Sequence, residues 1–209
     1  MTRIKICGIT RTEDALAAAR LGAHAIGLLF YAGSPRCITL AKALEIVRAL
    51  PPFVTPVALF VNPTIAEVQN VLATFPVGLL QFHGDEDEAF CSQFSFPYIK
   101  AIRVGPDTDL VQCAVDFRSA QALLLDAQVA GSFGGTGKTF DWRLIPASVD
   151  LPIILSGGLN AQNVAHALNS VKPWAVDVSS GVESAKGIKD ARKIAAFIHE
   201  VRSLDNADV

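Results

Sequence analysis

The sequence is poor in charged residues and has no cluster of basic ones. Only 18% of its 209 residues are Asp, Glu, Lys or Arg, and the formal net charge is -2. A protein that binds nucleic acid needs a basic stripe or patch to neutralise phosphates. We therefore expect no nucleic-acid partner, whereas a small anionic ligand needs only a few local donors and is not excluded.

Long apolar runs are also absent. Gly, Pro or charge interrupts every apolar stretch before it reaches the ~18 residues that a membrane span requires. The chain begins with a strand-like run that contains Arg3 and Lys5, and this run lacks the basic start, apolar core and cleavage site of a secretory signal. We expect a cytoplasmic protein with no membrane partner.

The cysteines are few and scattered. The four of them, Cys7, Cys37, Cys91 and Cys113, show no CxxC spacing. This pattern indicates neither a disulfide framework nor a zinc site, so we expect each to be a free thiol.

Apolar residues, by contrast, make up 51% of the chain, which suits a sheet buried on both faces. Short apolar runs of β type alternate with amphipathic stretches rich in Ala, Leu, Glu and Lys, as in parallel strands joined by crossover helices. The predicted strands are residues 3–7, 23–30, 55–61, 77–83, 98–104, 122–127, 152–157 and 175–180.

Eight strands in 209 residues leave about 26 residues for each strand and its helix, a compact version of the (β/α)8 barrel. The sequence therefore predicts a single-domain (β/α)8 TIM barrel over residues 1–209, with a frayed polar tail from about residue 203. The alternative is a doubly wound open sheet. That fold normally has fewer strands and a Gly-rich turn after the first one, whereas the Gly-rich turns here follow later strands.

The pattern also predicts where several helices begin. Thr10 and Glu13 have the spacing of a capping box, and Gly22 stands where that helix would end. Asn62 and Asn160 open two further helices. The helical signals are weakest after the fifth and sixth strands.

The active site of such a barrel lies at the carboxyl ends of the strands, so reactive residues that end an apolar run are the candidates. Cys7 ends the first strand, and Lys5 shares its face at roughly 6.6 to 7 Å along the chain, where its charge would favour the thiolate. A lone cysteine is more often a buried apolar side chain. Asp126 ends the sixth strand, where a carboxylate is paired, caps a helix or stays protonated for use as an acid.

Two glycine-rich turns follow the last two strands, SGGLN at 156–160 and SSGVE at 179–183. Both offer unhindered backbone N–H groups, the first runs into a predicted helix, and the recurring phosphate site of (β/α)8 barrels lies after strands seven and eight. Tight turns that need a positive φ are the alternative explanation. The predicted phosphate-binding residues are Gly157, Gly158, Ser179, Ser180 and Gly181.

A third glycine cluster, residues 131–142, contains the tripeptide Gly137 to Thr139 that resembles part of a nucleotide-binding P-loop. The spacing fails, because Ser132 occupies the position of the first required glycine. We predict instead a mobile loop after strand six that could fold over a ligand beside Asp126.

Three further polar residues follow strands. Arg36 could pair with a substrate carboxylate through its planar fork, or be a solvated surface charge. His83 either contacts a ligand or satisfies its own hydrogen bonds in the barrel mouth. Asp177 either accepts an N–H from the substrate or bonds Lys5 or Arg103 inside the barrel.

Together these segments resemble the phosphoribosylanthranilate isomerase family of tryptophan biosynthesis, from end to end of the chain. The motifs occur in order and with matching spacing. One departure is Phe82, where an aliphatic residue is expected, but strand parity puts it on the face opposite His83. The motifs are KICGIT (5–10), SPR (34–36), QFHGDE (81–86), LLLDA (123–127) with GGTGKTFDW (134–142), SGGLN (156–160) and DVSSGVE (177–183).

The resemblance implies an Amadori rearrangement of a phosphorylated small-molecule substrate, with no metal and no cofactor. It implies that Cys7 is the general base and Asp126 the general acid. It further implies that Arg36 grips the anthranilate carboxylate, that Asp177 lies near the anthranilate ring, and that the SGG and SSG turns bind the phosphate. A monomer is the default expectation.

Two alternatives remain open at this point. One is another phosphosugar-processing barrel, either a synthase that forms indole glycerol phosphate, which would need catalytic Lys and Glu at strand ends, or a metal-using epimerase, which would need clustered His and Asp. The chain has only four histidines. The other alternative is a barrel that binds phosphate without catalysis.

Overall fold

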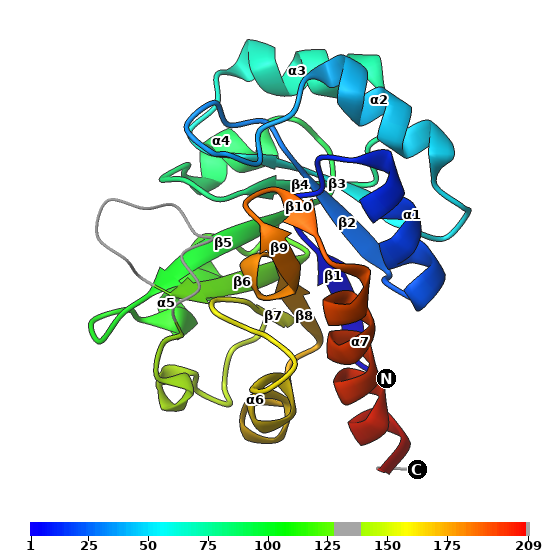
Figure 1. The fold of residues 1–209 in the computed structure, drawn as a ribbon. Helices are drawn as coiled ribbons and strands as arrows, with labels where there is room; N and C mark the ends of the chain where they lie inside the picture. Colours follow the sequence, from blue (N-terminus) through cyan, green and yellow to red (C-terminus); the bar gives the residue numbers. More distant parts are fainter. Residues whose placement is uncertain (128–138, 208–209) are drawn as a thin grey trace.

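The computed structural model describes residues 1–127 and 139–207, and its centre is a closed barrel of eight parallel strands (Figure 1). The barrel closes because β8 pairs with β1 as well as with β7. This confirms the predicted barrel and excludes the open sheet. The strands are β1 (Arg3–Ile6), β2 (Ala25–Leu29), β3 (Thr55–Phe60), β4 (Leu79–Phe82), β5 (Tyr98–Val104), β6 (Ala122–Ala127), β7 (Ile153–Leu155) and β8 (Ala175–Val178).

Helices surround the barrel and connect its strands (Figure 1). Between β6 and β7 the described residues form only a 3₁₀ turn, η1 (Trp142–Leu144), in agreement with the weak helical signal there. No helix within the described ranges is long and apolar enough to cross a membrane. The helices are α1 (Thr12–Leu21), α2 (Leu40–Ala49), α3 (Ile65–Thr74), α4 (Glu88–Ser92), α5 (Leu110–Asp116), α6 (Val164–Val171) and α7 (Ala191–Ala207).

An unpredicted hairpin lies between β8 and α7. A 3₁₀ turn, η2 (Ser180–Val182), follows β8, and the short strands β9 (Glu183–Ala185) and β10 (Ile188–Lys189) then pair antiparallel. Elements of three, three and two residues leave little hydrophobic periodicity to read in the sequence, so the pattern predicts only a turn here.

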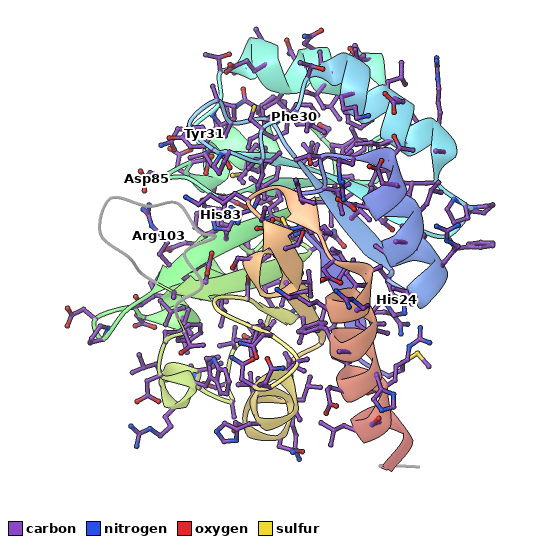
Figure 2. All side chains as sticks on the ribbon, in the orientation of Figure 1. His24, Phe30, Tyr31, His83, Asp85 and Arg103 are labelled. Carbon is purple, nitrogen blue, oxygen red and sulfur yellow. The ribbon has the colours of Figure 1, made fainter. Side chains whose placement is uncertain are left out.

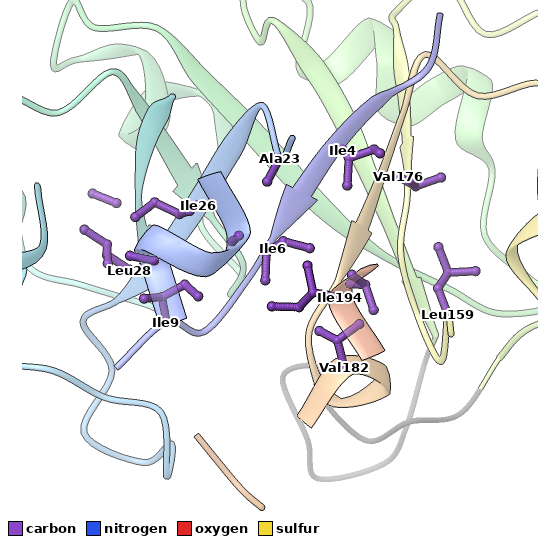
Figure 3. Close-up of a cluster of buried hydrophobic side chains, with 14 of the residues drawn as sticks. Ile4, Ile6, Ile9, Ala23, Ile26, Leu28, Leu159, Val176, Val182 and Ile194 are labelled. Atoms are coloured by element: carbon purple, nitrogen blue, oxygen red, sulfur yellow. The ribbon is translucent and has the colours of Figure 1, made fainter. Parts of the chain in front are cut away.

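The strands are apolar on both faces because the barrel separates two cores. One face points into the barrel, where a small cluster that includes Ala101, Leu124 and Ile154 fills the interior. The other face packs under the helices: Ile4 and Ile6 of β1 join Ile194 of α7 in the large outer cluster (Figure 3). This explains the near-continuous apolar runs that predict the strands.

All three predicted helix starts differ from the structure, and two of them belong to α1 and α3. The helix after Thr10 begins at Thr12 with Arg11 as its N-cap, and the Thr10 hydroxyl donates instead to the carbonyl oxygen of Gly187 in the hairpin. The helix after Asn62 is capped by Thr64, whose capping box uses Glu67. Tertiary contacts account for both differences, because Thr10 bonds the hairpin and the Asn62 side chain accepts the backbone N–H of Asp85 at 2.6 Å. Gly22 does end α1, with φ 103°.

The chain end is also more ordered than predicted. The helix α7 continues to Ala207, so the expected frayed polar tail from residue 203 is helical up to that point. Leu204 packs against the outer core. The Asp205 carboxylate accepts hydrogen bonds from the Thr2 backbone N–H at 2.9 Å and from the Thr2 hydroxyl at 3.0 Å. These contacts to a residue at the other end of the chain hold the polar segment in helical form.

We therefore expect Asp205→Ala to lower the free energy of unfolding by about 1 kcal/mol, because two hydrogen bonds to a partly buried carboxylate are lost. Chemical denaturation would measure the difference. Asp107→Ala, at an exposed acidic residue, is the matched control and should stay within about 0.5 kcal/mol of the parent. Equal stability of the two variants would contradict the assigned role of Asp205.

Candidate active site

The carboxyl ends of the strands surround two adjoining cavities of about 70 Å³ and 30 Å³. Four residues line both cavities: Asp126, Ser156, Asp177 and Ser179. The structure thus brings together every site residue predicted from the sequence except Gly181. The larger cavity adds Cys7, Arg36 and His83, and the smaller adds Gly157, Gly158 and Ser180.

Cys7 lies at the floor of the larger cavity, and the chain makes room for it. A Cβ on Gly27 of β2 would stand 2.6 Å from the Cys7 Sγ, so a larger residue there would displace the thiol. Burial raises the pKa of Cys7, while the charges of Lys5 and Lys189 oppose the shift and that of Asp177 adds to it. Lys5 therefore favours the thiolate, as predicted, but burial outweighs the two cations.

Lys5 is occupied by a different partner. Its Nζ lies 2.8 Å from Oδ1 of Asp177, and both side chains are buried. The strand register places them side by side, because Lys5 of β1 is the direct neighbour of Asp177 in β8. Burial lowers the pKa of Lys5, but Asp177 and Cys7 outweigh burial and raise it on balance. Of the partners considered for Asp177, the structure pairs it with Lys5.

Asp126 ends a chain of three buried polar side chains. The Gln81 Nε2 lies 2.9 Å from His83 Nδ1, and His83 Nε2 lies 3.2 Å from Asp126 Oδ2. An amide nitrogen can only donate, so Nδ1 accepts, and the ring hydrogen on Nε2 points to the carboxylate. The other oxygen of Asp126, Oδ1, accepts the Ala127 N–H at 2.8 Å. In the free protein both oxygens of Asp126 therefore accept hydrogen bonds.

The position of His83 follows from strand parity. Gln81 and His83 face the barrel interior, whereas Phe82 points outward into an aromatic cluster with Phe60 and Phe94, as predicted. Figure 2 shows His83 at the same end of the barrel as the ion pair of Asp85 with Arg103, and His24 at the opposite end, where it precedes β2.

Arg36 reaches the cavity from the loop after β2 and is buried, not a solvated surface charge. Its Nε and Nη2 donate to the two carboxylate oxygens of Glu183, each at 2.8 Å. Those hydrogen bonds raise the pKa of Arg36. A Cβ on Gly8 would lie 2.5 Å from the Arg36 Cδ, so this glycine lets the arginine stem cross directly over the end of β1.

The two glycine-rich turns form the smaller cavity. Gly157 and Gly158 have φ of 81° and 64°, so these positions also need glycine for the backbone. Gly181 lines neither cavity. A Cβ there would stand 2.0 Å from the Leu159 carbonyl oxygen, so Gly181 lets the two turns touch. Its contact with a ligand stays a prediction, and the structure adds this packing role.

The predicted helix after Asn160 begins later than expected. Asn163 is the N-cap and α6 starts at Val164. The Asn160 Oδ1 accepts the backbone N–H of Gln162 at 2.9 Å, and the Asn163 Nδ2 donates to the Gly158 carbonyl at 2.9 Å. A separate turn therefore lies between the glycines and the helix, and its asparagines hold the Gly158 backbone.

A buried lysine and glutamate near the barrel mouth do not face the cavities. Lys100 of β5 lies beside Phe82 on the outer face of the sheet, and its Nζ donates to Glu86 at 2.9 Å and to the Gly84 carbonyl at 2.7 Å. Glu86 in turn accepts the backbone N–H groups of Asn62 and Gly84. This pair holds the loop after β4. It does not line either cavity, so it is not the catalytic Lys and Glu that an indole-forming synthase would need there.

Comparison with known proteins decides the family. The family model for N-(5'-phosphoribosyl)anthranilate isomerase matches residues 4–200. The chain belongs to this family. The phosphoribosylanthranilate isomerase of Thiobacillus denitrificans (strain ATCC 25259 / T1) is 57% identical over 201 residues, which cover 96% of this chain and 98% of that relative.

Solved isomerase structures agree with the fold. That of the Thermotoga maritima enzyme has a TM-score of 0.89 at 40% identity, and an isomerase in complex with reduced 1-(o-carboxyphenylamino)-1-deoxyribulose 5-phosphate has 0.87 at 38%. Monomers generated from the dimeric Thermotoga maritima isomerase have 0.86 at 37%. Each comparison covers 97% of this chain and 100% of the other.

Sequence reasoning missed two charged residues of this isomerase-family site, Glu183 and Lys189. Both lie in the hairpin after β8 and are buried. Glu183 ends the DVSSGVE motif, but nothing nearby in the sequence indicates that its partner is Arg36. Nor does a local signal mark Lys189, because a lone lysine before a helix is ordinarily expected in solvent. The one applicable signal is a general rule: a buried charge is costly unless it is paired, so burial of Glu183 would imply a partner of opposite charge.

The glycine cluster of residues 131–142, for which a mobile loop is predicted, lies outside the described residues as far as residue 138, so that prediction is not tested. Within the part of the chain that is described, no group of three or more His, Cys, Asp and Glu side chains could hold a metal ion. All four cysteines are free, as predicted.

The raised pKa of Cys7 predicts slow alkylation that accelerates with pH. A thiol whose pKa is raised has less thiolate at a given pH than free cysteine, so its reaction with iodoacetamide should rise steeply only at a pH above that at which free cysteine ionises. Exposed Cys37 is the reference in the same sample. In Lys5→Met, which removes an opposing cation, we expect the rise at still higher pH. Peptide mass mapping would give both rates, and a Cys7 profile with its midpoint below that of free cysteine would show that burial does not control this thiol.

Proposed function

We propose that the protein isomerises N-(5'-phosphoribosyl)anthranilate to 1-(2-carboxyphenylamino)-1-deoxyribulose 5-phosphate in tryptophan biosynthesis. One observation carries the proposal: a thiol and a carboxyl group face the same cavity between an arginine at one side and two glycine-rich turns at the other. The family membership and the isomerase solved with a reduced product analogue support this substrate class.

Asp126 is the proposed general acid. A proton from its carboxyl group passes to the ribose ring oxygen, the bond from that oxygen to C1′ breaks, and the nitrogen lone pair forms an iminium with C1′. In the free protein the Asp126 carboxyl group accepts hydrogen bonds from His83 and from the backbone N–H of Ala127, and these contacts hold it beside the cavity.

Cys7 is the proposed general base. Its thiolate removes the proton from C2′, and the electrons of that C–H bond form the double bond to C1′ while the iminium nitrogen regains its lone pair. The enolamine then tautomerises to the ketone. Although burial disfavours the thiolate, the iminium supplies a positive charge during this step. No bond forms between sulfur and substrate.

The remaining residues would bind the two ends of the substrate. Arg36 would take the anthranilate carboxylate, since a guanidinium matches a carboxylate in charge and geometry. The backbone N–H groups of the two turns, with Ser179 and Ser180, would take the phosphate. Asp177 would lie near the anthranilate ring, with Lys5 fixing its orientation.

Removal of either proton-transfer group should abolish most of the activity. We expect Cys7→Ala and Asp126→Asn each to lower kcat by at least ~10²-fold, because general acid or base catalysis contributes ~10² to 10⁴. The conversion of phosphoribosylanthranilate can be followed by its fluorescence. Cys37→Ala, at an exposed thiol, should retain the parent rate.

A folded Cys7→Ala or Asp126→Asn variant that keeps more than about a hundredth of the parent kcat would show that the acid and base are assigned wrongly. If the parent protein bound phosphoribosylanthranilate without converting it, the proposed activity itself would be wrong.

The oligomeric state, domain organisation and location remain proposals. We propose one (β/α)8 domain acting as a monomer in the cytoplasm, although a Thermotoga maritima relative is dimeric.

Sedimentation equilibrium of the monomer should give a mass of about 22.2 kDa. A doubled mass would overturn the monomer and would direct attention to Phe53 and Trp174, which are exposed at the amino-terminal end of the barrel. Cell fractionation would test the location.

A further inference from the structure

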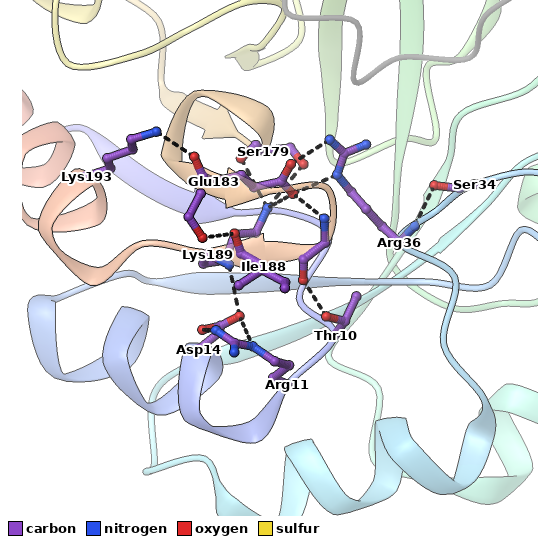
Figure 4. Close-up of polar contacts among 12 residues, drawn as sticks. Thr10, Arg11, Asp14, Ser34, Arg36, Ser179, Glu183, Ile188, Lys189 and Lys193 are labelled. Atoms are coloured by element: carbon purple, nitrogen blue, oxygen red, sulfur yellow. Dashed lines mark hydrogen bonds and ion pairs between the residues drawn. The ribbon is translucent and has the colours of Figure 1, made fainter.

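The hairpin after β8 contacts both Arg36 and Ser179 (Figure 4), two residues that line the larger cavity. Glu183 of β9 holds the Arg36 guanidinium, and Lys189 of β10 lies between Glu183 and Ser179. The hairpin is itself attached to the rest of the barrel: the Lys189 backbone N–H donates to Asp14 of α1 at 3.0 Å. A side chain that would contact one end of the substrate is thus linked through two hairpin residues to the turn at the other end.

Glu183 determines which edge of Arg36 is available. A guanidinium has two edges that can each receive a carboxylate in a fork. Glu183 occupies the edge formed by Nε and Nη2, with both distances at 2.8 Å. Among the described residues the structure gives Nη1 no acceptor. The edge that includes Nη1 is therefore the one that a substrate carboxylate can approach.

The charges of the group leave a net attraction for an anion. The Lys189 side chain is fully buried, and its Nζ has three acceptors for its three N–H groups: Oε1 of Glu183 at 2.8 Å, and the carbonyl and hydroxyl oxygens of Ser179 at 3.1 and 3.3 Å. Burial would raise the pKa of Glu183, but hydrogen bonds from Arg36 and Lys189 lower it on balance, so its carboxylate is ionised. Two cations and one anion leave one positive charge.

We propose that Glu183 is a positioning residue for substrate recognition: it fixes the Arg36 guanidinium so that the edge with Nη1 faces the cavity, while Lys189 compensates the charge of Glu183 and connects the pair to Ser179. This inference rests on the proposed function, because the group recognised is the substrate carboxylate. Glu183 does not touch the reacting atoms, and its effect is confined to binding.

The test separates orientation from charge through the variants Glu183→Gln and Glu183→Asp. Glu183→Gln removes a negative charge, so charge alone predicts tighter binding of the anionic substrate and a lower KM. Orientation predicts a KM raised by about tenfold or more, because the fork that holds Arg36 is lost, with kcat within about threefold of the parent.

Glu183→Asp keeps the charge but is one methylene shorter, so it cannot reach both Nε and Nη2 from the same backbone position. Charge alone predicts no change in KM for this variant, whereas orientation again predicts an increase of several-fold. Because it retains the ion pairs in part, this variant also serves if Glu183→Gln does not fold. Lys42→Met, which removes a half-buried lysine paired with Glu45, is the control and should match the parent.

Inorganic phosphate as a competitive inhibitor gives the second readout. It would occupy only the turns at the far end, so its inhibition constant should stay within about twofold in both variants while KM rises. A lowered or unchanged KM in both variants, or a phosphate constant that rises as much as KM, would overturn the positioning role. A parent protein without turnover would instead overturn the proposed function.

Discussion

The buried ion pair of Lys5 with Asp177 lies where the barrel closes, and the rest of the site is placed relative to it. Its two residues are direct neighbours across the seam between the first strand and the last. Cys7 lies two residues beyond Lys5, and Ser179 two residues beyond Asp177, so one register sets the positions of both. Breaking a buried pair by removing one partner costs about 3–5 kcal/mol, since the other charge is left unpaired. The same ion pair therefore stabilises the pairing of β1 with β8 and fixes the positions of Cys7 and Ser179 at the cavity.

The free site holds its two proposed proton-transfer groups in different ways. Burial raises the pKa of the Cys7 thiol, and the Asp126 carboxyl group accepts hydrogen bonds on both oxygens. The iminium of the proposed reaction brings a positive charge beside this thiol and favours its thiolate. The intermediate thus adds to the positive charge that Lys5 and Lys189 already place near Cys7.

Features that depend on neighbours within a few residues could be predicted from the sequence, and those that depend on distant partners could not. Buried parallel strands leave long apolar runs, and any reactive residue that ends such a run, as Cys7 and Asp126 do, must lie at the barrel mouth. Glu183 and Arg36, however, are separated by 147 residues, and nothing local distinguishes this pair from two solvated charges. The start of α1 differs for the same reason, because Thr10 bonds a hairpin too short to show a period. The ionisation of Cys7 depends on its depth of burial, which only the fold determines.

The contact between Thr2 and Asp205 brings the two ends of the described chain together at one side of the barrel (Figure 1). The amino group of Met1 also lies 4.0 Å from the Asp205 carboxylate. A short linker between the ends would turn the polypeptide into a ring without crossing the barrel mouth, and the ring could be reopened at an exposed connection elsewhere. We therefore expect that the eight strands can be joined in a different order along the chain without changing the barrel that they form.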